Sequence, residues 1–223
     1  MPNATYTIAI LGGTGHEGAG LGLRWAKAGH TVLIGSRVAE KAQAAAAALN
    51  ARLNLNTVRG YENAEAARRA EIVTLTVPYA AHAATIESVR DAVQGKIFID
   101  VTVPLVPPKV SRVQLPAGGS ASLEAQALLG PNVRVVTAFQ NISAEHLKDP
   151  DHPIDCDVLV CGDDKDAKAV VIQLAADAGL RAWDAGPLAN SVVPEALTSV
   201  LIGLNLRHKV KASGIRITGI QGN

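Results

Sequence analysis

Residues 8–18, IAILGGTGHEG, lie near the start of the chain and carry its strongest indication of fold. An apolar run suited to a buried strand leads into glycines at the G-x-G-x-x-G spacing: Gly13, Gly15 and Gly18. A helix with an apolar face follows, and Gly29 ends it before the apolar run at 31–34. The spacing alone is a weak signal, but a strand–helix–strand unit of about thirty residues predicts a dinucleotide site with the pyrophosphate at the helix N-terminus.

The end of the second strand indicates which dinucleotide is preferred. NAD-binding units usually carry Asp or Glu there, for the ribose 2′-hydroxyl, whereas this chain reads Gly35-Ser36-Arg37. Ser36 can donate to a 2′-phosphate, and Arg37 can bind it with two parallel charged hydrogen bonds. Lys41 lies four residues beyond Arg37, on the same face of the next helix. The sequence therefore predicts NADP(H) as the cofactor.

Composition narrows the class of protein. The chain has 223 residues and a formal net charge of +1, so nothing indicates nucleic acid or a membrane surface as a partner. It contains neither an 18-residue apolar stretch nor a signal peptide, and we expect a cytoplasmic protein. Cys156 and Cys161 flank an apolar run and are expected in the core. The histidines show no metal-ligand spacing, so no metal site is predicted.

Strands and helices alternate through the first part of the chain. Further strands are expected at 57–61, 71–78, 96–100 and 133–139, and helices at 39–50, 63–70, 80–93 and 122–129. The Pro- and Gly-rich segment 103–119 is expected to be a long ordered loop. This α/β alternation predicts a Rossmann-type, doubly wound parallel sheet that forms an NADP-binding domain at residues 1–138.

The remaining residues, 139–223, predict a smaller C-terminal α/β domain. After a turn-rich linker at 149–153, strands are expected at 157–161 and 180–184, and helices at 166–178 and 194–206. We expect this domain to pack over the cofactor cleft and to complete the substrate site.

Two motifs of the second half of the chain become distinctive when they are considered together with the glycine turn and with Ser36, Arg37 and Lys41. With VCGDD at 160–164 and DAGPLANS at 184–191, the chain closely resembles the NADPH-dependent reductases of coenzyme F420, or F420:NADP oxidoreductases, over nearly its whole length. The resemblance implies direct hydride exchange between C4 of the nicotinamide and C5 of an 8-hydroxy-5-deazaflavin. It also implies coenzyme F420 as co-substrate and a homodimer.

The resemblance further implies roles for individual residues. Those expected to bind the cofactor are Gly13, Thr14, Gly15, His16, Glu17, Ser36, Arg37, Lys41, Val77, Pro78 and Ala138. Those expected to bind the substrate are Gln140, Asn141, Ile142, Gly186, Pro187 and Ser191. The family often has a histidine near Gln140 or Asn141, and this chain has none there; the two amides can hydrogen-bond a deazaflavin or a different acceptor.

Two alternatives stay open at this stage. Hydride transfer between two bound rings is a matter of positioning, so no catalytic residue is assigned. An NADPH-dependent reductase of a small imine, ketone or flavin would need a proton donor, for which Tyr79, His82 and Glu195 are candidates without a supporting motif. A non-catalytic NADP-binding sensor would need only the first domain, whereas the motifs of the second indicate a second ligand.

A basic cluster follows the last helix. Its members are Arg207, His208, Lys209, Lys211 and Arg216. Because the family's deazaflavin carries an acidic tail, these residues are expected to attract it.

Overall fold

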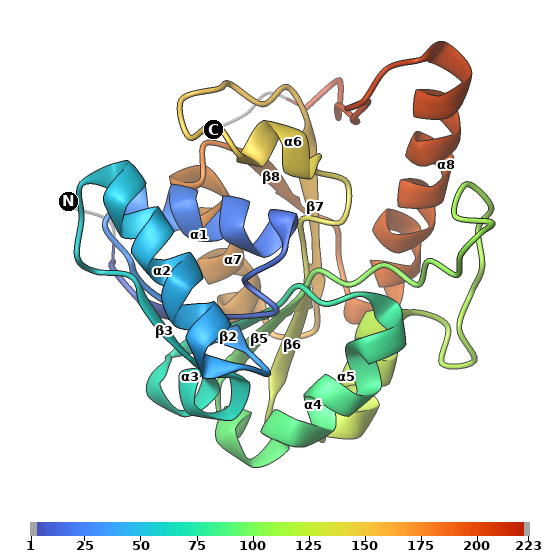
Figure 1. Cartoon of the computed structure of the whole chain (residues 1–223). Coiled ribbons are helices and arrows are strands. Elements are labelled where there is room, and N and C mark those ends of the chain that lie inside the picture. The colour runs from blue at the N-terminus through green and yellow to red at the C-terminus, as the bar shows by residue number, and fades with distance from the viewer. Residues whose placement is uncertain (1–3, 221–223) are drawn as a thin grey trace.

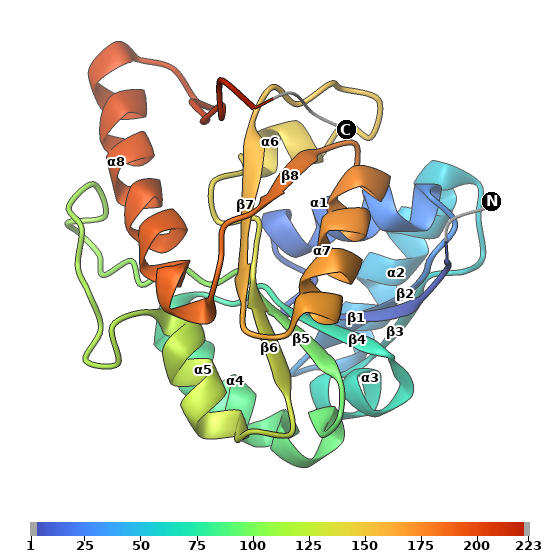
Figure 2. The ribbon, with the colours of Figure 1, turned by 180° about the vertical axis from the view of Figure 1, so that it is seen from behind.

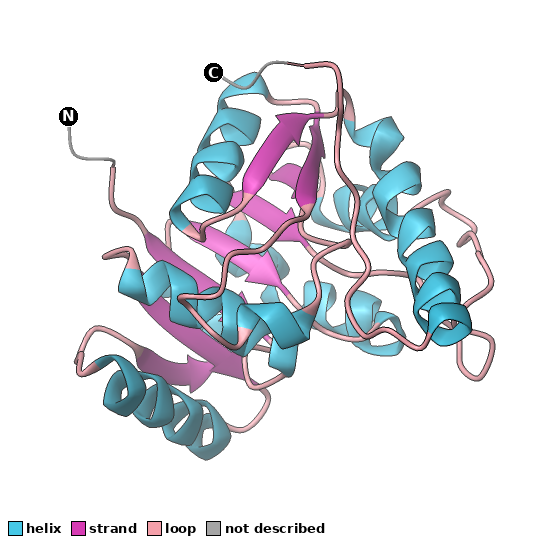
Figure 3. Cartoon of the chain, turned by 90° about the horizontal axis from the view of Figure 1, so that it is seen from above, coloured by secondary structure: helices cyan, strands magenta, loops and turns pink. Residues whose placement is uncertain are grey.

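The computed structural model describes residues 4–220, which form a sheet covered by helices on both faces (Figures 1 and 3). In this part of the chain eight strands form one sheet in the order β3-β2-β1-β4-β5-β6-β7-β8. The strands are β1 (Thr7–Leu11), β2 (Thr31–Ser36), β3 (Arg59–Glu62), β4 (Ile72–Leu75), β5 (Ile97–Asp100), β6 (Arg134–Thr137), β7 (Asp157–Gly162) and β8 (Arg181–Asp184). The predicted Rossmann-type α/β fold is confirmed.

Two groups of helices sandwich the sheet (Figure 1). One face carries α1 (His16–Lys27), α2 (Ala39–Leu53) and α7 (Lys165–Asp177), and the other carries α3 (Asn63–Arg69), α4 (His82–Val89) and α5 (Ala121–Leu129). The short α6 (Ala144–Leu147), which the sequence did not predict, packs on α1. The 3₁₀ turns are η1 (Tyr79–Ala81), η2 (Arg90–Val93) and η3 (Leu188–Ser191), so the helix expected at 80–93 is α-helical only in its middle.

Strand β1 shows why the apolar run predicts a central strand. Ile8 and Ile10 lie in the core beneath α1 and α2, whereas Ala9 and Leu11 lie in the core on the opposite face. All four side chains are fully buried. A parallel strand covered on both faces needs an unbroken apolar sequence because successive side chains point to opposite sides.

The C-terminal half continues the same sheet (Figure 2). Strand β7 pairs antiparallel with β6, Val136 opposite Gly162 and Thr137 opposite Cys161, and all other neighbouring strands are parallel. The division of the chain into two domains at residue 138 stays a prediction. Cys156 and Cys161 are free and buried, as expected for core residues.

The long helix α8 (Val192–His208) stands beside the sheet together with the loop that joins β5 to α5 (Figures 1 and 2). This loop, 103–119, contains no strand or helix, as predicted. It approaches α8 closely, since a Cβ atom on Gly203 would lie 3.8 Å from Ser111. Within the described residues, no helix is both long enough and apolar enough to cross a membrane.

Candidate functional site

The glycine turn joins β1 to α1, and two of its glycines are needed for packing. A Cβ atom at Gly13 would lie 2.8 Å from the carbonyl oxygen of Ile10. One at Gly18 would lie 2.5 Å from Oγ1 of Thr76, just beyond β4. Gly12, which the fingerprint does not include, has a φ of 75° and so adopts a left-handed conformation that favours glycine. These residues allow α1 to pack closely on β1 and β4.

Gly15 differs, because the protein itself leaves room for a side chain there. A Cβ atom would meet only the carbonyl oxygen of Gly12, at 3.4 Å. Gly15 is the N-cap of α1, and no side chain caps this helix. The first-turn amides of a helix have no partner within the helix and bind phosphate well. The geometry therefore supports the predicted pyrophosphate site.

A cavity of about 270 Å³ lies between the glycine turn and the end of β2. Ser36, Arg37 and Lys41 line it, and no Asp or Glu of residues 4–220 does. Arg37 and Lys41 are exposed, and neither forms an ion pair within that range. A 2′-phosphate in this cavity would meet two cations and no carboxylate, as the sequence predicted.

A second cavity, of about 610 Å³, adjoins the first. Both cavities are lined by Gly15, Thr76, Val77 and Pro78, so they lie next to each other at the carboxyl ends of the strands, and together they are called the cleft below. Segments that are far apart in the sequence line the larger cavity; they include His16, Glu17, Tyr79, Thr102, Gln140, Ile142 and Thr198. Apolar side chains of the loop 103–119 close another side.

Most residues predicted to bind ligands line this cleft. They are Thr14, Gly15, His16, Glu17, Ser36, Arg37, Lys41, Val77, Pro78, Gln140 and Ile142. Gly13, Ala138 and Asn141 lie behind the lining: Gly13 and Ala138 are buried, and the Asn141 amide donates to the carbonyl of Pro194 at 2.8 Å. Their contact with a ligand stays a prediction.

The loop between β8 and α8 does not line the cleft. Gly186 has a φ of 96°, and its amide donates to Asp184 Oδ1 at 2.9 Å. Ser191 is fully buried, with its Oγ 2.6 Å from Oγ of Ser120. These contacts give Gly186 and Ser191 structural roles in joining the last helix to the sheet. The assignment of both, and of Pro187, to the substrate stays a prediction.

Glu17 brings a carboxyl group without a partner into the larger cavity. Its Oε1 is buried, and no described residue donates a hydrogen bond to it. Burial raises the pKa of Glu17 to about 8, so the neutral acid predominates at neutral pH. A neutral carboxyl group can donate a hydrogen bond to a phosphate oxygen, whereas a carboxylate would repel the phosphate.

Of the three candidate proton donors, only Tyr79 lines the cleft. Its hydroxyl donates to Oε2 of Glu124 at 2.8 Å. Burial, together with the hydrogen bond and charge of Glu124, raises the pKa of Tyr79 to about 12. The hydroxyl proton of Tyr79 is therefore already engaged in a hydrogen bond to the Glu124 carboxylate.

His82 and Glu195 are buried behind the cleft. Nε2 of His82 lies 2.7 Å from Oδ2 of Asp100. Burial opposes a charge on His82, but the hydrogen bond and charge of Asp100 raise the pKa of the imidazole overall. Glu195 accepts from the amides of Ala121 and Ser122 at the start of α5, and burial raises its pKa to about 7. Neither His82 nor Glu195 lines the cleft.

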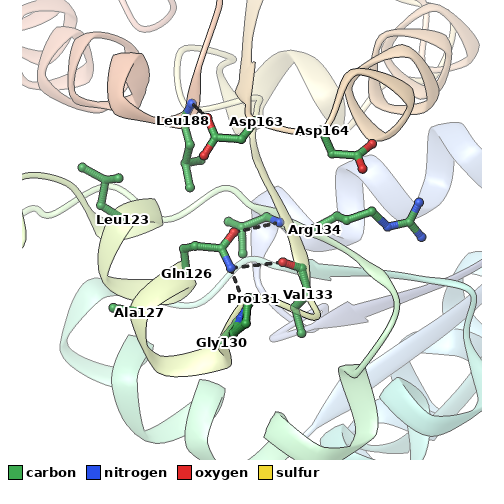
Figure 4. A pocket seen from close by; sticks show the side chains of 11 residues that line it. Leu123, Gln126, Ala127, Gly130, Pro131, Val133, Arg134, Asp163, Asp164 and Leu188 are labelled. Carbon is green, nitrogen blue, oxygen red and sulfur yellow. Dashed lines mark hydrogen bonds between the residues drawn. The ribbon is translucent and has the colours of Figure 1, made fainter.

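Another pocket, of about 750 Å³, lies between α5 and the loop after β7 (Figure 4). Polar side chains that line this pocket already form hydrogen bonds within the protein. The Gln126 amide donates to the carbonyls of Gly130 and Val133, and Asp163 accepts from the amide of Leu188. None of the residues predicted to bind a ligand lines this pocket. The cleft, which contains polar groups without a partner among residues 4–220, is therefore the better candidate.

Sequence reasoning missed several residues of the cleft. Thr102 follows the carboxyl end of β5, the same kind of position that identified Val77 and Pro78, so its signal was present. Thr198 lies within α8 and carried no signal. Among residues 4–220, no three His, Cys, Asp or Glu side chains are grouped so that they could hold a metal ion.

Comparisons with known proteins show the family of this chain. Residues 7–104 match the family model described as NADP oxidoreductase coenzyme F420-dependent. The chain is 43% identical to the F420-dependent NADP reductase of Methanocaldococcus jannaschii, with 96% of this chain and 99% of that protein covered. It is 45% identical to the enzyme of the same name from Methanothermobacter marburgensis, over 96% and 98% of the two chains.

A solved structure is also similar. A candidate F420-dependent NADP reductase from Arthrobacter sp. FB24 matches with a TM-score of 0.79 and 26% identity, over 96% of this chain and 99% of that one. A glycine turn, a basic cavity free of acids and an adjoining apolar chamber thus occur in a chain that matches reductases over almost its full length. The chain belongs to the family of F420-dependent NADP oxidoreductases.

Proposed function

We propose that this protein transfers a hydride directly between NADP(H) and coenzyme F420. The observation that carries the proposal is the cleft, in which a basic cavity of about 270 Å³ adjoins a chamber of about 610 Å³. The first cavity suits the 2′-phosphate end of NADP, and the second has room for a nicotinamide and a deazaflavin ring. Relatives named F420-dependent NADP reductase support this assignment.

The chain's own residues act by positioning and by excluding water. NADP(H) supplies the hydride at its nicotinamide ring, and F420 accepts it. Ser36, Arg37 and Lys41 hold the 2′-phosphate, and the first turn of α1 holds the pyrophosphate. Apolar side chains such as Val77 and Ile142 form much of the chamber wall. Such a wall keeps water from two reacting carbons that must approach within about 3–3.5 Å.

The proposal is tested by isotope transfer. The purified protein is mixed with F420 and NADPH that carries deuterium at C4, in the R or the S position. We expect one of the two isomers to deliver its deuterium to C5 of the deazaflavin without exchange with solvent. Oxidised F420 should lose its visible absorbance as NADPH is consumed. Turnover of FMN, a ketone or an imine with no turnover of F420 would refute the proposal.

The part of the chain at 139–223 is proposed to complete the chamber. Gln140, Ile142 and Thr198 line it from this part, and Gly15 lines it from the glycine turn. Arg207, His208, Lys209 and Lys211 are exposed, whereas Arg216 pairs with Asp155. The exposed members remain available to attract the acidic tail of F420. A Lys209→Ala, Lys211→Ala variant should raise the KM for F420 at low salt more than at high salt, and an unchanged KM would remove these lysines from the site.

The homodimer is proposed to form through α8. Glu195 is the one charged residue between 192 and 206, and most of the other residues there are apolar. Yet Val193, Val200 and Leu206 are 56%, 47% and 69% exposed. Burying these apolar side chains against a second copy of the chain would stabilise a dimer. Light scattering should give a molar mass twice the chain mass of 23.1 kDa. Val200→Glu should lower this mass to that of one chain, whereas the control Leu55→Glu should leave it unchanged. A monomeric wild type would refute the dimer.

A further inference from the structure

Besides Glu17, two residues that line the larger cavity carry a buried polar atom without a partner among the described residues. Oγ1 of Thr102 and Oε1 of Gln140 are both buried without a hydrogen bond from any described residue. The two residues are only 2% and 6% exposed, and both line the 610 Å³ cavity. Buried polar atoms in native proteins are nearly always hydrogen-bonded, because an unmade bond costs the full penalty of removing the atom from water. Both atoms are therefore expected to contact a ligand.

A single residue, Asp100 at the end of β5, holds the backbone of Thr102 and the side chain of Gln140. The Thr102 amide donates to Oδ1 of Asp100 at 2.9 Å. Nε2 of Gln140 donates to the Asp100 carbonyl oxygen at 2.7 Å. Oδ2 of Asp100 is in turn bound to Nε2 of His82 at 2.7 Å. Because Gln140 uses its amide nitrogen in this network, the oxygen Oε1 is the end left without a partner.

We propose that Thr102 and Gln140 recognise the carboxamide of the nicotinamide ring, and that Asp100 and His82 position them. This inference rests on the proposed function. A carboxamide presents an N–H donor beside a carbonyl acceptor. Oε1 of Gln140 can only accept a hydrogen bond, so it accepts one from the carboxamide N–H. The hydroxyl of Thr102 donates to the carboxamide carbonyl. Both contacts together fix the rotation of the ring, and with it the face from which hydride leaves.

The course of the cleft places the carboxamide there. With the 2′-phosphate at Arg37 and the pyrophosphate at Gly15, the dinucleotide passes Val77 and Pro78, which line both cavities, and ends in the larger one. The nicotinamide is the terminal group of NADP. It therefore reaches the chamber that Thr102 and Gln140 line.

The test uses binding alone, with no F420 present. Dissociation constants are measured by calorimetry for NADP⁺ and for its 3-acetylpyridine analogue, which has a methyl group in place of the carboxamide NH₂. Wild type should bind NADP⁺ about tenfold more tightly, since the analogue leaves Gln140 unpartnered. In Gln140→Met, which keeps the length of the side chain, this ratio should fall to about one.

Further variants separate recognition from general structural damage. Thr102→Val should weaken NADP⁺ binding, and Thr102→Ser should restore it. His82→Asn should weaken NADP⁺ and its analogue alike, because His82 contacts the Asp100 carboxylate that holds the Thr102 amide and not the carbonyl that holds Gln140. Thr74→Val removes another buried, unpartnered hydroxyl that lies outside the cleft lining, and it should leave the ratio unchanged. All variants should bind 2′-phospho-ADP-ribose, which lacks nicotinamide, as wild type does.

Two outcomes would overturn the inference while leaving the proposed function intact. One is a Gln140→Met variant that still prefers NADP⁺ to the 3-acetylpyridine analogue by the same factor as wild type. The other is a loss of F420 affinity in Gln140→Met and Thr102→Val with NADP⁺ binding unchanged, because the pair would then recognise the deazaflavin. A wild-type protein that binds neither NADP⁺ nor 2′-phospho-ADP-ribose would instead refute the proposed function, and this inference with it.

Discussion

Replacing each of two glycines of the same turn by alanine should change different properties. Gly18→Ala should lower stability, whereas Gly15→Ala should weaken nucleotide binding. At Gly18 the added methyl group would lie 2.5 Å from Oγ1 of Thr76 and 2.8 Å from Cα of Gly13. The second contact is with backbone and cannot be relieved by a rotamer change. Such overpacking costs about 1–3 kcal/mol. In a chain of this size each kcal/mol lowers Tm by about 2–4 °C, so Gly18→Ala should lower it by about 2–12 °C.

At Gly15 the protein has space for an added methyl group, but that space is where the pyrophosphate is expected to bind. The methyl group would meet only the carbonyl oxygen of Gly12 at 3.4 Å, and φ is −78°, which alanine adopts freely. Gly15→Ala should therefore keep the wild-type Tm. The methyl group would hold the pyrophosphate away from the first-turn amides of α1. Losing one charged hydrogen bond costs about 1.5–3 kcal/mol, a factor of about 10 to 150 in affinity for NADP⁺ and NAD⁺ alike.

The assay pairs differential scanning fluorimetry without ligand with calorimetric titration of both nucleotides. Gly18→Ala should move the unfolding temperature and Gly15→Ala the dissociation constants. The reasoning is refuted if Gly15→Ala folds normally and binds NADP⁺ as tightly as wild type, since the amides of α1 would then not hold the pyrophosphate. It is also refuted if Gly18→Ala keeps the wild-type Tm.

Three further predictions concern charge. Arg37→Ala should weaken NADP⁺ about 10- to 150-fold and leave NAD⁺ unchanged, by fluorescence titration, and equal wild-type affinities for both would contradict the basic cavity. Burial raises the pKa of Glu17, so the folded state resists its ionisation and stability falls as pH rises from about 4.5 to about 8. Glu17→Gln should therefore raise Tm at pH 9 but not at pH 4; an equal effect at both would exclude this cause. Although burial opposes it, the hydrogen bonds of Arg181, Ile217 and Trp183 hold the pKa of Asp157 below its usual value. Asp157→Asn should cost about 1.5–3 kcal/mol in urea unfolding at pH 7, and the difference from wild type should shrink as pH falls through the Asp157 pKa, whereas a constant difference would exclude the ion pair.

The local half of the site follows from the order of the amino acids alone. A strand, a glycine turn, a helix and the next strand end fall within residues 8–41, and backbone geometry brings them together. Gly15 and Arg37 can therefore be identified from residue types and their spacing. The apolar run of β1 likewise requires a strand covered on both faces, because its alternate side chains point to opposite sides of the sheet.

The other half of the site depends on long-range packing. Thr102, Gln140 and Thr198 come from three distant segments, and the packing of α8 and of the loop 103–119 brings them into one chamber. No local pattern gives the antiparallel direction of β7 or shows that Gly186 and Ser191 lie outside the cleft lining. The raised pKa of Glu17 is likewise invisible in the sequence, because it arises from burial. Propensity and periodicity act between near neighbours, whereas burial and hydrogen-bond partners are fixed by contacts that exist only once the whole chain has packed.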